Sequence, residues 1–558
     1  MGARKVVVLW AMVLAGCATT SGSGGPSPFT SAEELKKLTS GPKPQQVFRT
    51  RTADVTLWTF LGPFPEEVSL APHEQESPAG KMIVAEASKR GAVATAAFAC
   101  AARELAHFVA EKQERPPIML QEAIAGRCAV GTTQLAWNWL EMDTGDATDE
   151  ALVEMAIPRL AQGFEGLSPS GFVGAALSRS GKKGVLALVH AEARGTLEPV
   201  SLFPGADGAV TLHGTAEPTA ADLVGVVTQG ELGAAPCVDL HLRALPQYDL
   251  RCPVQATDDS AWISVAMRAK GRLLSQELRR VLVWPSRRPS TAWTVPQIIP
   301  PGVPSTVEGL TAQVNALRAG AGLRPLELSA NQSADLHEVA PFLFQAVVSS
   351  DGATADQLGL GIIAGWHVEK DITYGNFCAE VAEHDDGSLL LTHALNSPST
   401  RALLFDPKAT LLGLGTYQEA GGLGVVFSVY RGLELPVFPA SVEPLVQQLN
   451  AARAKHSRGP VKWTRLPANA ELGIAGALAA RKLEVPEALS GFLEATVAAT
   501  GRGAQGFSVE MESLEEVPWP ADLINAEQVE LSLVAAPVRR PRAPWAHFVV
   551  MIARPEAQ

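Results

Sequence analysis

Histidine and acidic residues crowd one stretch of this 558-residue chain and are its first candidates for chemistry. His367 and His393 bracket Glu380, Glu383 and the pair Asp385-Asp386. Imidazole and carboxylate groups are common zinc ligands, and they also act as general acids and bases. The stretch is therefore compatible with a metal-dependent hydrolase whose site is built around His367, Glu380 and His393.

The spacing of these residues favours a different interpretation. No His-x-x-x-His or Cys-x-x-Cys motif fixes a metal site, and no Gly-x-Ser-x-Gly elbow provides a serine nucleophile. The run His384-Asp385-Asp386-Gly387 is typical of a solvated turn, because Asp-Gly is ordinary turn chemistry. We therefore predict no catalytic residue, no cofactor and no metal ligand, and keep the hydrolase as the alternative.

Two predicted helices carry a second kind of polar pair, Asn315/Arg318 and Asn450/Arg453. Residues three apart lie on adjacent turns of a helix, so each pair can bridge to a neighbouring loop or strand. The pairs stand 135 positions apart, and nine identities between positions 307–325 and 442–460 share that offset. This repetition predicts an internal duplication in which both pairs are structural.

Further motifs follow the first pair in a fixed order. Gly322-Leu323-Arg324-Pro325-Leu326 is followed by Tyr374-Gly375-Asn376, then by Ser397-Pro398-Ser399-Thr400-Arg401, and then by Gly413-Leu414-Gly415. In this order they resemble a CAP domain (cysteine-rich secretory protein, antigen 5 and pathogenesis-related family, also called SCP-like). The resemblance implies an α-β-α sandwich with a groove. In the family, this groove has been linked to the binding of lipids, sterols and other apolar molecules.

The departures from the family pattern argue against its polar chemistry. Gly375 runs directly into Asn376, so the acid of the family's Tyr-Gly-Glu-Asn motif is missing, and Thr400 replaces the histidine of its Ser-Pro-Gly-His-Arg motif. We therefore expect the fold without the family's His and acid tetrad. The motif residues expected to be structural are Asn315, Arg318, Tyr374, Asn376, Ser397, Pro398, Arg401, Asn450 and Arg453.

The N-terminus predicts export. Arg4 and Lys5 precede a short apolar run of about ten residues, which is too short to span a bilayer. The run ends in Leu14-Ala15-Gly16-Cys17, which resembles a bacterial lipobox and implies cleavage before Cys17 and attachment of a diacylglyceryl group with acyl chains such as palmitate. Residue 18 is Ala instead of the Asp that retains lipoproteins at the inner membrane, so we expect the outer membrane. An ordinary secretory peptide is the alternative.

Five other cysteines remain in the exported chain, where disulfides can persist. Cys100 with Cys128 and Cys237 with Cys252 form local pairs, and we predict both disulfides. Cys378 is then the odd cysteine, for which a buried thiol is favoured over a reactive nucleophile.

Composition and turn signals predict a multidomain α/β protein with a sizeable core, because 46% of residues are hydrophobic and 19% are charged. Nucleic acid is an unsuitable partner at a formal charge of −12. The expected parts are a signal peptide (1–17), a flexible tether (18–45), an α/β domain for which a diverged CAP-like copy is one interpretation (46–195), an immunoglobulin-like β-sandwich (196–284), a Pro-rich linker (285–304), a CAP-like domain (305–435) and a second degenerate copy (437–558).

The function predicted from these features is binding or interaction in the bacterial cell envelope without catalysis. The membrane is the expected partner through the N-terminal lipid, and an apolar small molecule or a cell-wall component is the expected ligand. Besides the hydrolase, a purely structural envelope spacer is the other alternative.

Overall fold

The computed structural model describes residues 13–14, 29–45, 47–48, 52–75, 77–133, 135–145, 147–164, 171–230, 232–270, 272, 274–286, 290–349, 351–383, 385–419, 422–433, 442–479, 482–511, 514, 517–538 and 544–556. The chain forms two compact units. Among the described residues, the first contains Val13–Leu14, Thr30–Ile362 and Asn376–Val429, and the second contains Phe29, Ile363–Gly375 and the chain from Tyr430 onward. Every described helix is too short or too polar to cross a bilayer.

One order of elements occurs three times, as a helix, a short strand, two helices, a long strand, one or two helices and a hairpin. The first repeat contains α2 (Pro78–Ser88), β4 (Val93–Ala94), α3 (Ala96–Lys112), α4 (Ile118–Arg127), β5 (Ala136–Asp143), α5 (Asp149–Phe164), β6 (Phe172–Ser180) and β7 (Lys183–Ala191). The second contains α6 (Val307–Gly320), β18 (Glu327–Leu328), α7 (Ala330–Val348), α8 (Gly352–Ala364), β19 (Ile372–Ala382), α9 (Gly387–Asn396), α10 (Pro398–Leu404), β20 (Leu411–Glu419) and β21 (Gly422–Gly432). The third contains α11 (Val442–Lys455), β22 (Lys462–Trp463), α12 (Ala468–Ala479), α13 (Val485–Thr500), β23 (Ala504–Met511), α14 (Ala521–Asn525), β24 (Glu530–Val538) and β25 (His547–Pro555).

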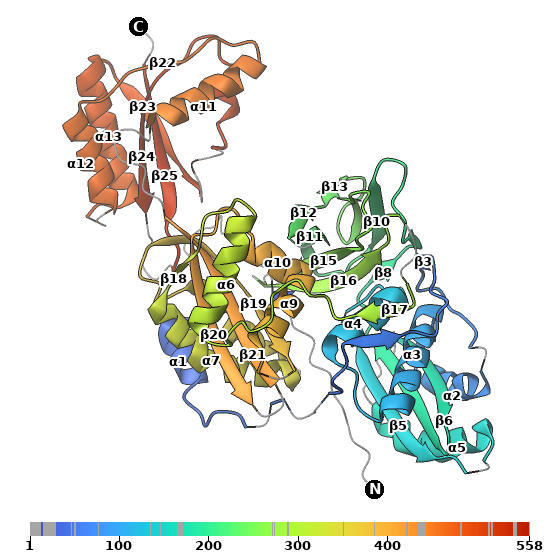
Figure 1. Ribbon diagram of the computed structural model, residues 1–558. Coiled ribbons are helices and arrows are strands. Elements are labelled where there is room, and N and C mark those ends of the chain that lie inside the picture. The colour runs from blue at the N-terminus through green and yellow to red at the C-terminus, as the bar shows by residue number, and fades with distance from the viewer. Residues whose placement is uncertain are drawn as a thin grey trace. The chain divides into compact units, whose positions relative to one another are not determined.

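The strand order is also the same in the three repeats. In each sheet the short strand pairs in parallel with the first hairpin strand, and the long strand borders the second, giving the orders β4-β6-β7-β5, β18-β20-β21-β19 and β22-β24-β25-β23. In the third repeat α12 and α13 cover one face of the sheet and α11 covers the other (Figure 1). The strand β1 (Val13–Leu14) adds to the free edge of β19.

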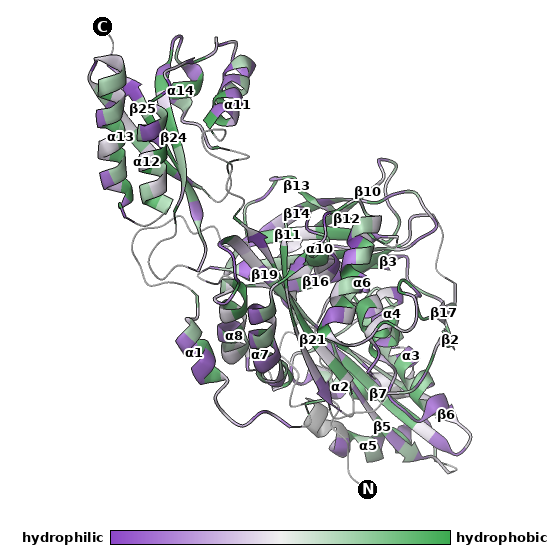
Figure 2. Ribbon diagram, turned by 60° about the vertical axis from the view of Figure 1, so that its left-hand side comes forward, coloured by the Kyte–Doolittle hydropathy of each residue, from purple (hydrophilic) through white to green (hydrophobic). Residues whose placement is uncertain are grey.

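The hairpin strands form the centre of each layered unit. β7 and β21 are buried along almost their whole length, and Figure 2 shows them coloured as hydrophobic. Helices approach the first hairpin strand closely at glycine: a Cβ on Gly174 would lie 2.0 Å from the backbone of Phe98 in α3, and one on Gly415 would lie 2.3 Å from that of Leu336 in α7. These two positions exclude any side chain.

Local signals fix the start and the end of α6. Thr306 caps the helix by accepting the N–H of Gly309, and Gly322 has the positive φ of +71° that follows many helix ends. Ser305 and Glu308 stand at the spacing of a capping box, but the N-cap in the structure is the next residue, Thr306. A hydroxyl at either position can cap a helix, so spacing alone does not separate them.

Between the first two repeats lie two four-stranded antiparallel sheets. One contains β8 (Thr196–Leu197), β10 (Ala209–Thr215), β14 (Gln247–Pro253) and β13 (Val238–Asp239), and the other contains β12 (Gly233–Pro236), β11 (Ala220–Gln229), β15 (Ala261–Ala269) and β16 (Ser275–Val283). The Cys237–Cys252 disulfide joins the end of β12 to β14, and Cys100–Cys128 joins α3 to the end of α4, so both predicted disulfides are present. The immunoglobulin-like assignment stays a prediction.

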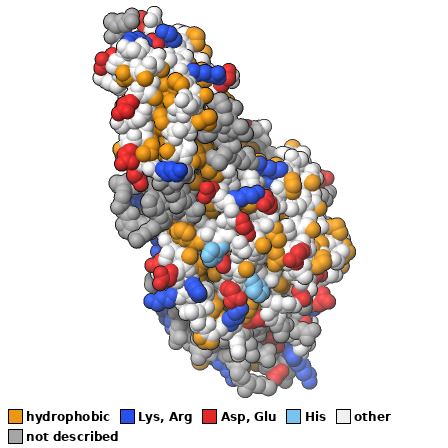
Figure 3. All heavy atoms as spheres, turned by 90° about the vertical axis from the view of Figure 1, so that its left-hand side faces the viewer, with side chains coloured by type: hydrophobic (Ala, Val, Ile, Leu, Met, Phe, Trp, Pro, Cys, Tyr) orange, Lys and Arg blue, Asp and Glu red, His pale blue; other side chains and the backbone are white. Residues whose placement is uncertain are grey.

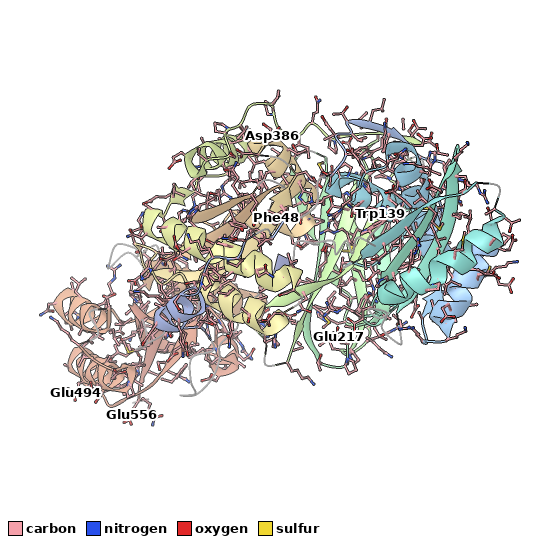
Figure 4. The ribbon with its side chains drawn as sticks, turned by 90° about the horizontal axis from the view of Figure 1, so that it is seen from below. Phe48, Trp139, Glu217, Asp386, Glu494 and Glu556 are labelled. Carbon is pink, nitrogen blue, oxygen red and sulfur yellow. A yellow bond between two sulfur atoms is a disulfide. The ribbon has the colours of Figure 1, made fainter. Side chains whose placement is uncertain are left out.

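Residues 29–45 depart from the flexible tether expected for residues 18–45. Ser31 and Glu34 form a capping box that starts α1 (Ala32–Leu38), whose Leu35 is buried. Farther along, the N–H groups of Val47 and Phe48 donate to the Glu419 carboxylate, and Phe48 (labelled in Figure 4) packs on Phe344. The segment therefore packs on the second repeat. Its composition does not predict this, because the few apolar side chains that make the contacts stand among many polar residues.

The Pro-rich segment 285–304 also packs on the protein. Within it, β17 (Ala292–Thr294) pairs with β2 (Leu57–Thr59), so that Trp293 lies opposite Trp58 and both side chains are buried. A second two-stranded pairing joins β3 (Glu67–Val68) to β9 (Val200–Ser201). The prolines restrict this segment, but its aromatic and aliphatic side chains still contribute to the core.

Candidate functional site

A buried cluster of five ionisable side chains and one hydroxyl lies where the first repeat, the β-sheets and the second repeat meet. We call it the charge cluster, and it consists of Glu122 on α4, Glu277 and Arg280 on β16, Glu380 on β19, His393 on α9 and Thr400 on α10. Each of these side chains belongs to the first compact unit and is at most 8% exposed. Buried charges persist in proteins only where they are paired, so the contacts within the cluster decide its role.

Arg280 holds two of the carboxylates. Its Nη1 donates to Glu122 at 2.8 Å, while Nε and Nη2 donate to the two oxygens of Glu277 at 3.0 and 2.9 Å. The Ser264 hydroxyl also donates to Glu277, at 2.5 Å. Planar, two-pronged binding of a carboxylate is the strongest arrangement that a guanidinium offers, so Arg280 fixes α4 to β16.

His393 lies between two other carboxylates. Its Nε2 is 3.4 Å from a Glu122 oxygen and its Nδ1 is 3.6 Å from a Glu380 oxygen, while the Thr400 hydroxyl donates a short hydrogen bond to the other Glu380 oxygen. Asp386 (labelled in Figure 4) caps the helix that carries His393 by accepting the N–H of Ser388 at 2.8 Å. The imidazole therefore joins the first repeat to the second.

These surroundings shift the pKa values of the cluster. Burial opposes the charged imidazole, but Glu122, Glu380 and Glu383 outweigh it and raise the pKa of His393 from 6.5 to about 9. Burial raises the pKa of Glu380. For Glu122, burial is outweighed by His393 and Arg280, which hold its pKa below the usual value. At neutral pH the cluster therefore contains a protonated imidazole that faces the ionised Glu122.

A pH-dependent stability follows from the raised pKa of His393. The folded protein binds this proton more tightly than the unfolded chain, so the stabilisation is complete below about pH 6.5 and is lost as the pH rises to about 9. We expect the opening free energy of α4 and α9, measured by native-state hydrogen exchange, to fall over that range by up to about 3 kcal/mol.

The matched variant for this prediction is His393→Gln, which retains a polar side chain but does not titrate. It should abolish most of the change between pH 6.5 and 9. An equal change in the variant would assign the titration to another group and contradict the prediction. Because the pKa of Glu122 is lowered, a separate loss of stability is expected only below its usual value of 4.5.

Two further contacts of the motif region join the same parts of the first unit. A Glu383 oxygen accepts the N–H of Ile118 at 2.7 Å, at the start of α4, where no side chain of the first repeat caps the helix. A carboxylate there also suits the positive end of the helix dipole. Arg401 Nη1 donates to the carbonyls of Gly230 and Gly233 at 2.7 and 3.3 Å, next to β11 and β12.

The other predicted motif residues lie in the core of the second repeat. Asn376 accepts the N–H of Phe377 at 2.8 Å, and Ser397 lies 3.3 Å from the Thr400 hydroxyl. Pro398 is the first residue of α10. Tyr374 belongs to the second compact unit, where Arg431 lies over its ring at 4.4 Å.

The two Asn-Arg pairs make the same contacts in their own repeats. The side-chain oxygens of Asn315 and Asn450 accept the N–H of Leu326 and of Val461, at 2.7 and 2.8 Å. The Nε atoms of Arg318 and Arg453 donate to the carbonyls of the residue six positions later, at 2.9 and 2.7 Å. Their Nη atoms donate to carbonyls before the hairpin, among them those of residues 404, 406 and 409 and of residues 523, 524, 526 and 527.

The three residues considered for a metal site are only partly brought together. Glu380 and His393 are in contact, whereas His367 belongs to the second compact unit. Among the described residues, no group of three or more His, Cys, Asp and Glu side chains is arranged to hold a metal ion. A cavity of about 10 Å³ beside Glu122 and Arg280 has room for about one water molecule.

Two cysteines remain outside the disulfides, Cys17 and Cys378. Cys17, the predicted lipidation site, lies outside the described residues. Cys378 is a buried free thiol on β19, and burial raises its pKa, which disfavours the nucleophilic thiolate.

Sequence reasoning missed Glu122, Glu277 and Arg280. They are far from the motif stretch along the chain. The signal in the sequence is a charge next to apolar residues, Glu122 in Ile118–Arg127 and Arg280 before Val281-Leu282-Val283, but the adjacent Arg279 shows that charge alone does not single out a cluster member. A buried charge requires a partner, but the sequence does not identify which residue that partner is.

Comparisons with known proteins identify no family for the chain. No family model matches it, and no curated protein is similar to it. Among solved structures, it is similar to a cysteine-rich secretory protein from Staphylococcus aureus subsp. aureus Mu50, with 14% identity over 42% of this chain and 84% of that chain, and a TM-score of 0.17. An extracellular protein containing a SCP domain from Bacillus anthracis str. Ames gives 16% identity over 42% and 86%, with the same TM-score. Structural similarity with such low identity and TM-score supports no conclusion about function.

Proposed function

We propose that this chain is an exported, lipid-anchored protein of the bacterial cell envelope, in which degenerate CAP-like repeats form a binding scaffold without catalysis. The lipobox-like Leu14-Ala15-Gly16-Cys17 supports the anchor, and the alanine at position 18 supports the outer membrane. The ordered motifs of the second repeat and the shared topology of all three support the CAP-like assignment.

The proposal that the scaffold is not catalytic depends on the contacts of Thr400 and its neighbours. Thr400 stands where the family motif has a histidine, is fully buried, and donates to Glu380, which faces His393. His393 in turn faces Glu122 of another repeat. Polar groups that could react are instead used to join parts of the chain, and a reacting group needs an approach for its substrate.

The same proposal includes a ligand for the scaffold. The expected ligand is an apolar small molecule or a cell-wall component, held at a surface outside the charge cluster. The two β-sheets between the first two repeats act in this proposal as an immunoglobulin-like spacer.

Substituting the predicted lipidation site tests the anchor. In cells, Cys17→Ala should move the protein from the membrane fraction to the soluble fraction, because acyl chains bind a bilayer through about 0.8 kcal/mol per buried methylene. The matched control is Cys378→Ala, which leaves the lipobox intact and should stay with the membrane. Membrane association that survives Cys17→Ala would refute the lipid anchor.

Metal analysis of the purified protein separates the scaffold from the hydrolase. The scaffold predicts no stoichiometric zinc and an unchanged melting temperature in chelator. Bound zinc that disappears in His393→Gln or Glu380→Gln, together with hydrolytic turnover lost in the same variants, would favour the hydrolase.

A further inference from the structure

Helix α12 presents an uncharged surface. Its only charged residue between Ala468 and Ala479 is Glu471, which is buried. Apart from Asn469 in its first turn, the exposed residues of α12 are apolar or small, with Leu472 46% exposed, and Val497 on the neighbouring α13 is 40% exposed. Figure 3 shows hydrophobic side chains grouped on this side of the third repeat, with acidic and basic side chains around them. A surface helix usually carries charges on its outer side, so this face is unusual.

The helices that correspond to α13 in the other two repeats are α4 and α8, and the chain itself covers both. On α4, a Cβ at Gly126 would lie 2.4 Å from Trp262 of β15. On α8, a Cβ at Gly361 would lie 2.8 Å from Leu35 of α1. In the third repeat, a Cβ at Gly491 of α13 would have no described atom within 4 Å, and the same holds for Gly473 and Gly476 of the adjacent α12. The outer side of this helix is therefore covered in the first two repeats and open in the third.

The N-terminal chain brings a bilayer close to this open layer. Phe29 packs on Trp545 of the third repeat, with ring centroids 4.7 Å apart, inside the second compact unit. Phe29 is only 12 positions from Cys17, and a chain of that length spans at most about 43 Å. A repeat of this size has a radius of gyration of about 14 Å, so a bilayer that holds the lipid of Cys17 is within reach of any of its faces.

We propose that the face formed by α12 and the C-terminal half of α13 rests on the bilayer to which Cys17 is attached. The proposal rests on the lipid anchor of the proposed function. A short tether keeps the local concentration of bilayer high, so a modest apolar face is enough for contact. Exposed Glu494 on α13 lies three residues before Val497 and therefore borders this face, and α11 on the opposite face of the sheet carries the exposed Glu443 and Lys455.

The contact depends on apolar side chains and not on basic ones. The described residues of α12 include no lysine or arginine. Attraction to anionic headgroups comes from such side chains, so the contact is expected to persist at high salt and on uncharged lipid.

The test uses the full lipidated protein in phosphatidylcholine vesicles, with one cysteine added for an environment-sensitive fluorophore. Leu472→Cys and Val497→Cys report the proposed face, and Gln447→Cys on α11 is the matched control, since Gln447 is exposed on the other side of the sheet. The native Cys378 is buried, and four other cysteines are in disulfides, so labelling is confined to the added residue.

The expected result is a blue-shifted emission at positions 472 and 497 that a quencher on the acyl chains removes, with neither effect at position 447. Water-exposed probes at 472 and 497 on protein that floats with the vesicles would overturn the bilayer contact and leave the anchor intact. Protein that fails to float would overturn both. A shift that needs no vesicles and grows with protein concentration would assign the face to a second copy and also overturn the proposal.

Discussion

Replacing Arg280 with methionine is expected to destabilise the first compact unit by about 3–5 kcal/mol, because the change leaves buried carboxylates without their cation. Arg280 donates to Glu122 at 2.8 Å and to both oxygens of Glu277 at 3.0 and 2.9 Å. Methionine fills a similar volume, so the loss reports charge and not a cavity. Hydrogen exchange of peptides from α4 and β16 should show the loss as faster opening.

Two comparisons make the Arg280 result specific. Arg251→Met removes a similar side chain from an exposed pair with Asp207 and should cost less than about 1 kcal/mol. Adding Glu122→Gln and Glu277→Gln to Arg280→Met should restore much of the loss, since neutral amides no longer need the cation. If the triple variant is no more stable than Arg280→Met alone, the penalty does not come from unpaired carboxylates.

Alanine at Arg318 or Arg453 is expected to destabilise its own repeat by about 3 kcal/mol or more, because each guanidinium is fully buried and satisfies several backbone carbonyls. Lysine should not rescue either position, since its single ammonium group cannot reproduce the planar fork. Local opening measured by hydrogen exchange should rise in the second repeat for Arg318→Ala and in the third for Arg453→Ala.

Each of these arginines has an exposed neighbour that serves as a control. Arg324→Ala in the second repeat and Arg458→Ala in the third should each change stability by about 0.5 kcal/mol or less. An effect of Arg453→Ala as small as that of Arg458→Ala would contradict the view that the third repeat has kept the packing of the second.

The offset of 135 residues could be read from the sequence because packing contacts are local. The Asn oxygen accepts an N–H 11 residues later in both repeats, and the Arg Nε donates to a carbonyl six residues later. Because the contacting residues are so close in sequence, the repeated pattern can be recognised within one short stretch. The two disulfides could be predicted for the same reason, since each joins cysteines that are near in sequence.

The charge cluster could not be predicted, because its members come from three distant parts of the chain. Glu122 and His393 are 271 positions apart, and no periodicity relates them. The packing of α1 on the second repeat could not be predicted either, since Leu35 packs beside Gly361 of α8, which is more than 300 positions away in the sequence. In both cases the partner is defined by tertiary structure and not by spacing.

The central claim is that the polar residues of the motif region now hold the repeats together. A double-mutant cycle of Glu122→Gln and His393→Gln in the full chain tests it most directly, with the opening free energies of α4 and α9 measured by hydrogen exchange near pH 6.5. The account predicts a favourable coupling of about 1 kcal/mol or more between the two side chains. Effects that add within about 0.3 kcal/mol would contradict it.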